Sequence, residues 1–100
     1  MGTLRPINLR YSARARSQLI AIQEYINERN PDAAIRVGAA IREAAQFLRY
    51  FPYAGRPGQS ADTREWVVRR FPYILVYEVN TGEENEIMIL GVFHSAQRRD

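Results

Sequence analysis

The one histidine of the chain, His94, is the residue best suited to proton transfer near neutral pH. Arginines and tyrosines could assist it by stabilising charge on a phosphate or by donating a hydrogen bond to one. These residues are Arg69, Arg70, Arg98, Tyr73 and Tyr77. Together the groups would suffice for metal-free cleavage of RNA through its 2′-hydroxyl. The alternative, which we favour on the residues alone, is that His94 and the two tyrosines close the end of a β-sheet.

Other catalytic chemistries lack the residues they need. With one histidine, no cysteine and no paired acids at ligand spacing, we expect neither a metal nor a cofactor. The stretch Gly55-Arg56-Pro57-Gly58 is rich in glycine, but it lacks the lysine and the following helix of a phosphate-binding loop. A Ser-His-Asp triad could draw on Ser60 or Ser95 with Asp62, but no nucleophile-elbow sequence surrounds either serine.

The length and composition restrict the class of protein. One hundred residues, 46% of them hydrophobic, fit a single domain spanning residues 1–100. No apolar run approaches the roughly 18–20 residues of a membrane-spanning helix. Arg5 and Arg10 interrupt the stretch where the apolar region of a signal peptide would lie. We therefore expect a cytoplasmic protein that does not act at a membrane.

Positive charge is concentrated at the start of the chain. All fourteen basic residues are arginines, and the formal net charge is +3. Arg5, Arg10, Arg14 and Arg16 all precede the first acidic residue, Glu24. Such a basic face suits an acidic partner, either a nucleic acid or an acidic protein segment, although a solvated helix face has the same composition.

The first half of the chain predicts a strand and a helical hairpin. Residues 7–11 alternate between apolar and polar side chains, as in a half-buried strand. Ser12 then offers a helix N-cap, and apolar residues follow it at helical spacing: Ala15, Leu19, Ile22 and Ile26. Asn30-Pro31 ends this helix and begins the next, because proline restricts the residue before it and suits a first turn. The second helix has its own stripe, Ala34, Val37, Ile41, Ala45 and Leu48.

The second half predicts a loop and three strands. Prolines and glycines make residues 51–62 a loop, and a period of two predicts strands over 65–71, 73–79 and 86–93. Asn80-Thr81-Gly82 supplies the turn between the last two strands. In the last strand we expect Ile87, Ile89 and Phe93 on one face and Met88, Leu90, Val92 and His94 on the other. A strand that is apolar on both faces is typically central and covered on both sides. The predicted fold is therefore α+β, in the order β-α-α-β-β-β, with a helical hairpin packed on a small, mainly antiparallel sheet.

Aromatic residues flank the pair Arg69-Arg70, as in proteins that stack single-stranded nucleic acid on aromatic rings. These residues are Trp66, Phe71 and Tyr73. The strand alternation requires most of the apolar side chains in this region for the core. We therefore assign Phe71 to the core and leave the role of Trp66 open.

Four segments, in this order along the chain, resemble one known family. They are Ile22-Gln23-Glu24-Tyr25-Ile26, then Phe51-Pro52-Tyr53-Ala54-Gly55-Arg56-Pro57, then Arg69-Arg70-Phe71-Pro72-Tyr73-Ile74-Leu75-Val76-Tyr77, and last Ile89-Leu90-Gly91-Val92-Phe93-His94 with Gln97 and Arg98 following. The second and third resemble the Gly-Arg-Pro connection and the Phe-Pro-Tyr strand of the RelE/ParE superfamily, toxins of bacterial type II toxin–antitoxin systems. The resemblance covers nearly the whole chain, and the family's fold has the element order predicted above.

The resemblance implies one of two activities. ParE-like members poison DNA gyrase by protein contact and lack a catalytic constellation, so that no catalytic residue is expected. RelE-like members are ribosome-dependent mRNA endonucleases, whose sites often use lysines, and this chain has none. As such an enzyme, it would rely on Arg70, Tyr77 and His94, with Glu65 as a further candidate. The long helical hairpin and the Gly-Arg-Pro and Phe-Pro-Tyr elements favour the ParE-like branch.

Both branches imply a cognate antitoxin, ParD-like in the favoured case, as the partner in a hetero-oligomer. The acidic and apolar C-terminal segment of such an antitoxin wraps around the toxin. Strand edges, helix grooves and the arginine excess suit a segment of this kind. The candidate residues for partner binding are Arg10, Arg14, Trp66, Arg70, Tyr73 and Arg98. A member without toxicity, retained in a DNA-binding repressor complex, is a third interpretation.

Overall fold

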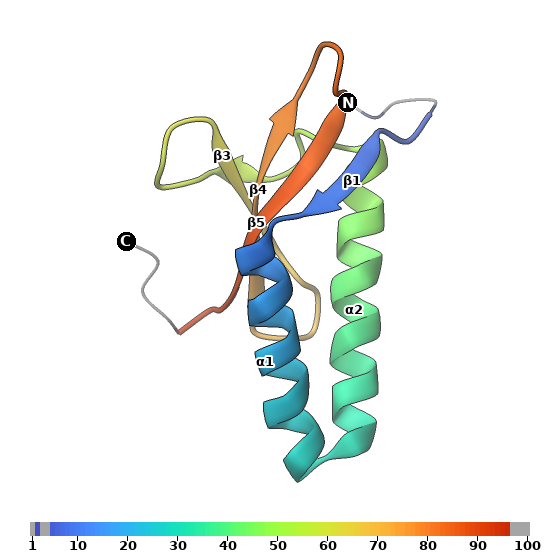
Figure 1. Cartoon of the computed structure of the whole chain (residues 1–100), viewed down its shortest axis with the longest axis vertical. Coiled ribbons are helices and arrows are strands. Elements are labelled where there is room, and N and C mark those ends of the chain that lie inside the picture. The colour runs from blue at the N-terminus through green and yellow to red at the C-terminus, as the bar shows by residue number, and fades with distance from the viewer. Residues whose placement is uncertain (1, 3–4, 97–100) are drawn as a thin grey trace.

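The fold combines a five-stranded sheet with a hairpin of two helices (Figure 1). The computed structural model describes residue 2 and residues 5–96 of the chain. Its elements are β1 (Asn8–Tyr11), α1 (Ala13–Arg29), α2 (Pro31–Tyr50), β2 (Arg56–Pro57), β3 (Thr63–Val67), β4 (Tyr73–Asn80) and β5 (Glu86–His94). The strand order is β1-β5-β4-β3-β2, in which β1 and β5 are parallel and the other neighbours antiparallel. The predicted α+β class and the mainly antiparallel sheet are confirmed.

Both helices begin at the residues predicted from local chemistry. The Ser12 side chain accepts a hydrogen bond from the Ala15 N–H at 3.0 Å and caps α1. Asn30 serves both helices, since its N–H donates to the Ile26 carbonyl at 2.7 Å and its Oδ1 accepts from the Ala33 N–H at 3.1 Å. The tight hairpin brings α1 and α2 side by side as a layer of their own (Figure 1).

The core lies between this helical layer and one face of the sheet. Its largest fully buried side chains are Tyr77, Ile41, Leu48, Leu75, Ile87, Ile89, Val68 and Val92. Ala15 is also buried, and Leu19, Ile22 and Ile26 of α1 pack against the same cluster. The two predicted helical stripes therefore face the sheet, where each buried methylene contributes about 0.8 kcal/mol.

The predicted faces of the last strand are wrong beyond Ile89. Tyr77 pairs with Ile89 and Val76 with Gly91, so that Leu90 is an extra residue and β5 is bulged. As a result Val92, rather than Phe93, shares the core face with Ile87 and Ile89. His94 follows Val92 to this face, opposite Tyr73. β5 is an interior strand as expected, because it pairs with both β1 and β4. The expected cover on both sides is incomplete, since Met88, Leu90 and Phe93 are only half-buried.

Contacts from α1 explain the bulge. Because β1 ends at Tyr11, the next residues of β5 need other hydrogen-bond partners. The Ser12 hydroxyl donates to the Leu90 carbonyl at 3.2 Å, and the Gln18 Oε1 accepts from the Val92 N–H at 2.8 Å. A Cβ on Gly91 would approach the Phe93 ring to 2.6 Å, so a larger residue at this position would displace that ring.

Two strand boundaries also differ from expectation. The loop predicted over residues 51–62 contains β2, which pairs with β3 at Arg56 and Pro57. β3 ends at Val67 rather than at residue 71, because the chain turns there to reach β4. The Val68 N–H donates to the Tyr73 carbonyl at 2.9 Å across this turn, and Arg70 has a positive φ of 71°.

Candidate functional site

The strand β4 carries two of the candidate tyrosines on the same face, and their surroundings differ. Tyr73 begins the strand and lies opposite His94, with the two rings edge to face at 5.5 Å between centroids. The His94 Nδ1 accepts a hydrogen bond from the Ala96 N–H at 3.1 Å, which leaves the proton of the neutral ring on Nε2. The Ser95 N–H donates to the Pro72 carbonyl at 2.6 Å and closes this end of the sheet. The structure therefore brings Tyr73 and His94 together.

Tyr77 lies in the interior instead. It is 0% exposed, and its hydroxyl donates to the Pro52 carbonyl at 2.8 Å and accepts from the Gly55 N–H at 2.9 Å. Burial raises the pKa of this hydroxyl, and the Gly55 hydrogen bond and the charge of Arg64 only partly oppose the shift. Four residues of strand separate it from Tyr73, roughly 13 Å along the sheet. The structure therefore does not bring Arg70, Tyr77 and His94 together.

Gly55 lies directly against the Tyr77 side chain. A Cβ at residue 55 would lie 2.6 Å from the Tyr77 hydroxyl oxygen and 2.8 Å from the Glu65 carbonyl oxygen. The connection between α2 and β3 is thus fastened onto the core by a close approach that only glycine allows. In this chain the Gly-Arg-Pro connection and the second tyrosine of the Phe-Pro-Tyr strand form one structural unit.

Glu65 is engaged at the far edge of the sheet. Its buried carboxylate accepts hydrogen bonds from Arg56 Nε at 3.3 Å and from Arg56 Nη2 at 3.1 Å. Glu65 pairs with Val76 in β4, three residues along the strand from Tyr73. Its contact with β2 fits a structural role better than a catalytic one at the His94 end.

The remaining basic candidates lie on different parts of the surface. Arg14 places its guanidinium 5.2 Å from the centre of the Phe93 ring, on the sheet face opposite His94. Arg70 is exposed in the turn that leads to Tyr73. Arg10, on β1, pairs with the buried Glu86 at 3.6 Å between Nη1 and Oε2. Arg98 lies outside the described residues.

Trp66 belongs to an aromatic stack that sequence reasoning missed. Its ring lies 5.0 Å from that of Phe47 at an angle of 22°, and Phe47 lies 4.8 Å from Phe51 at 20°. Phe47 and Phe51 are four residues apart at the end of α2, a spacing that could have indicated their contact. Trp66 is half-buried here, and the exposed sides of Phe47 and Phe51 extend the apolar surface.

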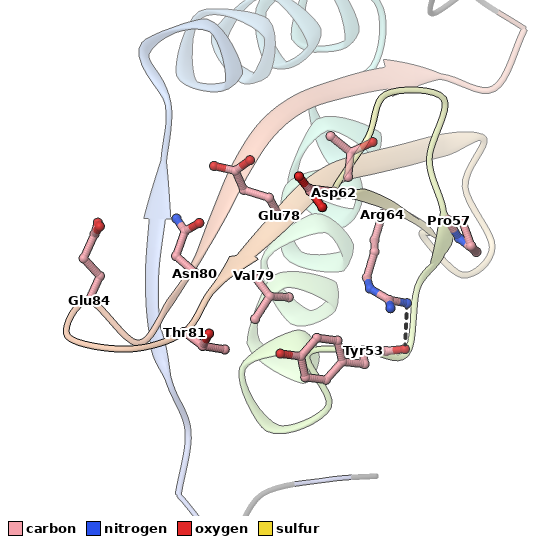
Figure 2. Close-up of a pocket in the computed structure, with 10 residues that line it drawn as sticks. Tyr53, Pro57, Asp62, Arg64, Glu78, Val79, Asn80, Thr81 and Glu84 are labelled. Atoms are coloured by element: carbon pink, nitrogen blue, oxygen red, sulfur yellow. Dashed lines mark hydrogen bonds between the residues drawn. The ribbon is translucent and has the colours of Figure 1, made fainter.

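A polar pocket of about 630 Å³ opens beside the end of β4 (Figure 2). Its lining includes Asp62, Glu78 and Glu84, together with Arg64 and Tyr53. The Arg64 Nη1 donates to the Tyr53 carbonyl at 3.2 Å and to the Gly55 carbonyl at 2.7 Å, so this arginine braces the loop fastened by Tyr77. Across residues 2 and 5–96, no group of three acids or histidines is placed to hold a metal ion.

The family of the chain follows from comparison with known proteins. Residues 9–99 match the family model described as the ParE toxin of the type II toxin–antitoxin system parDE. The chain belongs to this ParE toxin family. The resemblance inferred from four segments of the sequence is thereby confirmed.

Two relatives of this ParE family member are named as toxins, and one of them carries a RelE name. The putative toxin Y4kP of Sinorhizobium fredii is 39% identical over 90 residues, 90% of either chain. Toxin RelE2 of Caulobacter vibrioides is 36% identical over 84 residues, covering 84% of this chain and 90% of that one. Among the described residues, no helix is long and apolar enough to cross a membrane.

Solved structures share the fold. The chromosomal ParDE system of P. aeruginosa matches with a TM-score of 0.77 at 24% identity, over 88% of this chain and 95% of the other. The toxin–antitoxin complex RelBE2 of Mycobacterium tuberculosis matches with a TM-score of 0.63 at 26% identity, over 97% and 100% of the two chains. Both matches show that the chain shares its fold with these proteins.

Proposed function

We propose that this ParE-family toxin inhibits DNA gyrase by protein contact and performs no chemistry of its own. The observation that carries the proposal is the burial of Tyr77, whose hydroxyl is committed to Pro52 and Gly55. RNA cleavage needs an acid, a base and phosphate-binding groups within hydrogen-bond reach of one substrate. The set Arg70, Tyr77 and His94 does not meet that requirement.

The match to the ParE family over residues 9–99 supports the same conclusion. Glu65, the further candidate for proton transfer, is held by Arg56 at the opposite edge of the sheet. A toxin that acts by contact needs exposed surface rather than a closed pocket. The exposed arginines and the aromatic stack of Phe47, Phe51 and Trp66 provide such surface.

A second candidate function is ribosome-dependent cleavage of mRNA. It is favoured by the contact between Tyr73 and His94 at the end of the sheet, next to the turn that carries Arg70. The relative named RelE2 is a further argument for it. In this case His94 would transfer the proton and Arg70 would bind the phosphate, with Tyr73 in place of Tyr77.

In either case we propose that the toxin forms a hetero-oligomer with a ParD-like antitoxin that neutralises it. The candidate contact residues that the structure leaves at the surface are Arg10, Arg14 and Arg70, whereas Trp66 is half-buried and Tyr73 is buried. Electrostatic pairing with these arginines would mainly speed the encounter, and apolar contacts would supply most of the affinity.

The test that separates the two activities is an in vitro translation reaction supplied with the toxin freed of its antitoxin. The proposal predicts that the mRNA stays intact while ribosomes translate it. Fragments cut on the ribosome would contradict the proposal and favour the endonuclease. A folded wild-type chain that fails to arrest growth on expression would instead support the non-toxic interpretation.

A further inference from the structure

The end of α2, the connection that follows it and β3 together carry most of the exposed hydrophobic side chains. Five of the eight large hydrophobic residues that are exposed among residues 2 and 5–96 come from this region. They are Phe47, Tyr50, Phe51, Tyr53 and Val67. Single exposed apolar side chains are ordinary on a protein surface, whereas a contiguous group marks a site of interaction.

Contacts between rings make this group contiguous. The centroid of the Phe47 ring lies 4.8 Å from that of Phe51 and 5.0 Å from that of Trp66. Tyr50 precedes Phe51 and lies one helical turn after Phe47, so its side chain extends the same flank of α2. These four residues form an aromatic patch. Phe47 is 39% exposed, and Tyr50 and Phe51 are each 42% exposed.

The edge of the sheet extends the aromatic patch. β2 pairs with β3 at Arg64 and Glu65, and β3 runs beyond this pairing to Val67. Val67 is 51% exposed, although valine is favoured in the interior. Trp66 and Val67 therefore reach the surface on the two faces of one strand end.

Positive charge surrounds the patch. Residues 44–61, which include the end of α2 and the connection, contain no acidic residue. Residues 64–77 contain one acid, Glu65, and Arg56 holds its carboxylate at 3.1 Å. The turn after β3 adds two exposed arginines, Arg69 and Arg70. A partner that covers the patch therefore needs acidic groups at its rim.

The arrangement of the rings favours a protein partner over a nucleic acid. The bases of a single strand stack on free ring faces. The Phe47 ring is already stacked at 20° against Phe51 and at 22° against Trp66, and Gly2 lies directly against the Phe51 ring. These faces are used within the toxin, so the exposed part of the patch consists mainly of ring edges. Aromatic residues with a charged rim are typical of contacts between proteins.

The position of the patch favours a partner other than a bound segment. An apolar groove of about 970 Å³ lies between β1, α1 and α2, and a groove of this kind can enclose an extended or helical segment. Gln46 lines the groove, and Phe47 follows it on α2, so their side chains point about 100° apart around the helix axis. The patch therefore lies on the other flank of α2, where the surface of a folded protein can reach it.

We propose that the aromatic patch is the surface through which the toxin docks on DNA gyrase, against an apolar protein surface with acidic groups at its rim. Phe47 and Trp66 are the central anchors, and Arg69 and Arg70 pair with the acids. The inference rests on the proposed function and assigns its contact to one surface. A second copy of the toxin fits the patch less well, because the exposed arginines of the two copies would then meet.

Two positions on α2 provide matched variants. Phe47 belongs to the patch, whereas Ile35 is 67% exposed and lies three turns away along the same helix. Phe47→Glu should raise the concentration of toxin that halves supercoiling by gyrase about thirtyfold or more, as loss of an interface anchor does. Ile35→Glu should leave this concentration within about threefold. Both variants should bind the co-expressed antitoxin as the wild type does, which shows that they are folded.

Tyr50→Glu keeps the test decisive if Phe47→Glu does not fold, since Tyr50 lies outside the ring stack. It should weaken inhibition of gyrase by about tenfold or more and leave antitoxin binding unchanged. Inhibition as strong as that of the wild type would overturn the assigned surface and leave gyrase as the target. A wild type that does not inhibit gyrase would overturn the target and the surface together. Loss of antitoxin binding in folded patch variants that still inhibit gyrase would assign the patch to the antitoxin.

The charged rim has a separate readout. Arg69→Glu should slow association with immobilised gyrase about tenfold at low salt, and the difference should shrink at high salt. Arg36 is exposed on α2 away from the patch, and Arg36→Glu should change the rate less than about twofold. Equal association rates for Arg69→Glu and the wild type would overturn the acidic rim.

Sedimentation of the toxin alone tests for the other occupants of the patch. The proposal predicts a monomer whose sedimentation is unchanged by Tyr50→Glu. A dimer that Tyr50→Glu dissociates would overturn the proposal in favour of a second copy. Loss of binding to a single-stranded oligonucleotide in Tyr50→Glu, with inhibition of gyrase retained, would overturn it in favour of a nucleic acid.

Discussion

Tyr73 and Tyr77 are the same residue type on the same strand and the same face, yet their surroundings differ. The ring of Tyr73 lies against His94 at the end of the sheet. The hydroxyl of Tyr77 is enclosed by the connection between α2 and β3 and has a partner on each side. Strand alternation determines the face of a side chain, but the segments that cross that face determine whether its polar group can meet a substrate.

This comparison leads to opposite expectations for the two ends of β4. The Tyr77 end fastens a loop, so its substitutions should change stability. Tyr73 is buried too, but no hydrogen bond to its hydroxyl is seen among the described residues, so removal of that hydroxyl alone should change stability little and would change activity only in an enzyme.

The largest effect is expected from Tyr77→Phe. The substitution leaves the Gly55 N–H and the Pro52 carbonyl buried without a partner, at a cost of about 2–4 kcal/mol in the free energy of unfolding. Urea denaturation of the wild type and the variant measures this difference. Tyr73→Phe is the control and should cost less than about 1 kcal/mol, because it removes a hydroxyl without a hydrogen-bond partner among the described residues and keeps the buried ring. Equal losses at the two positions would show that Tyr77 does not fasten the loop.

Gly55→Ala should come next, with a loss of about 1–3 kcal/mol, because the new methyl group overpacks the site. The Cβ would lie 2.6 Å from the Tyr77 hydroxyl oxygen. In the Tyr77→Phe background this oxygen is gone, so the same alanine should cost less. A double-mutant cycle by thermal or urea unfolding measures the coupling, and strict additivity would argue against contact between the two sites.

A smaller effect is expected at alkaline pH. Burial raises the pKa of Tyr77, and of Tyr11 and Tyr73, above the usual value of about 10. Up to that pH both the folded and the unfolded chain keep the proton, so the stability is unchanged. At higher pH the unfolded chain loses the proton first, and the free energy of unfolding should fall. The fall should be shallower in Tyr77→Phe, and an identical pH profile would contradict the assigned burial.

The smallest effect is expected from His94→Gln. Its unfolding free energy should change by about 1 kcal/mol or less, because His94 is only half-buried at the end of the sheet. Growth arrest on expression without antitoxin should persist, because the proposed function uses no proton transfer. A variant that folds and binds antitoxin but no longer arrests growth would favour the endonuclease.

Much of the fold follows from local sequence. Ser12 and Asn30 define the helix ends through their own side chains, and the apolar stripes indicate the buried faces. Such signals depend on neighbours in sequence, so they can be recognised before the fold is known.

The bulge at Leu90 could not be predicted in this way. It depends on the hydrogen bond that Ser12 donates to Leu90 and on the one that Gln18 accepts from Val92, and both partners are more than seventy residues away in sequence. One extra residue then exchanges the faces of Val92 and Phe93 and moves His94 to the core side. The alternation of side chains along the sequence of a strand does not indicate such a shift.

The candidate site was predicted only in part. The contact of Tyr73 with His94 joins two residues selected from the sequence. The burial of Tyr77 could not be predicted, because strand alternation places Tyr73 and Tyr77 on the same face. The loop that covers Tyr77 is positioned by the close contact between Gly55 and the Tyr77 hydroxyl, which the sequence does not reveal. An apolar groove of about 970 Å³ between β1, α1 and α2 was hidden as well, because residues from three elements line it.

The most direct test of the central claim is a supercoiling assay with DNA gyrase, relaxed plasmid and the toxin freed of its antitoxin. The account predicts loss of supercoiling with accumulation of cleaved plasmid, both for the wild type and for His94→Gln. Addition of the antitoxin should restore supercoiling. Undiminished supercoiling in the presence of a folded toxin that arrests growth would contradict inhibition of gyrase.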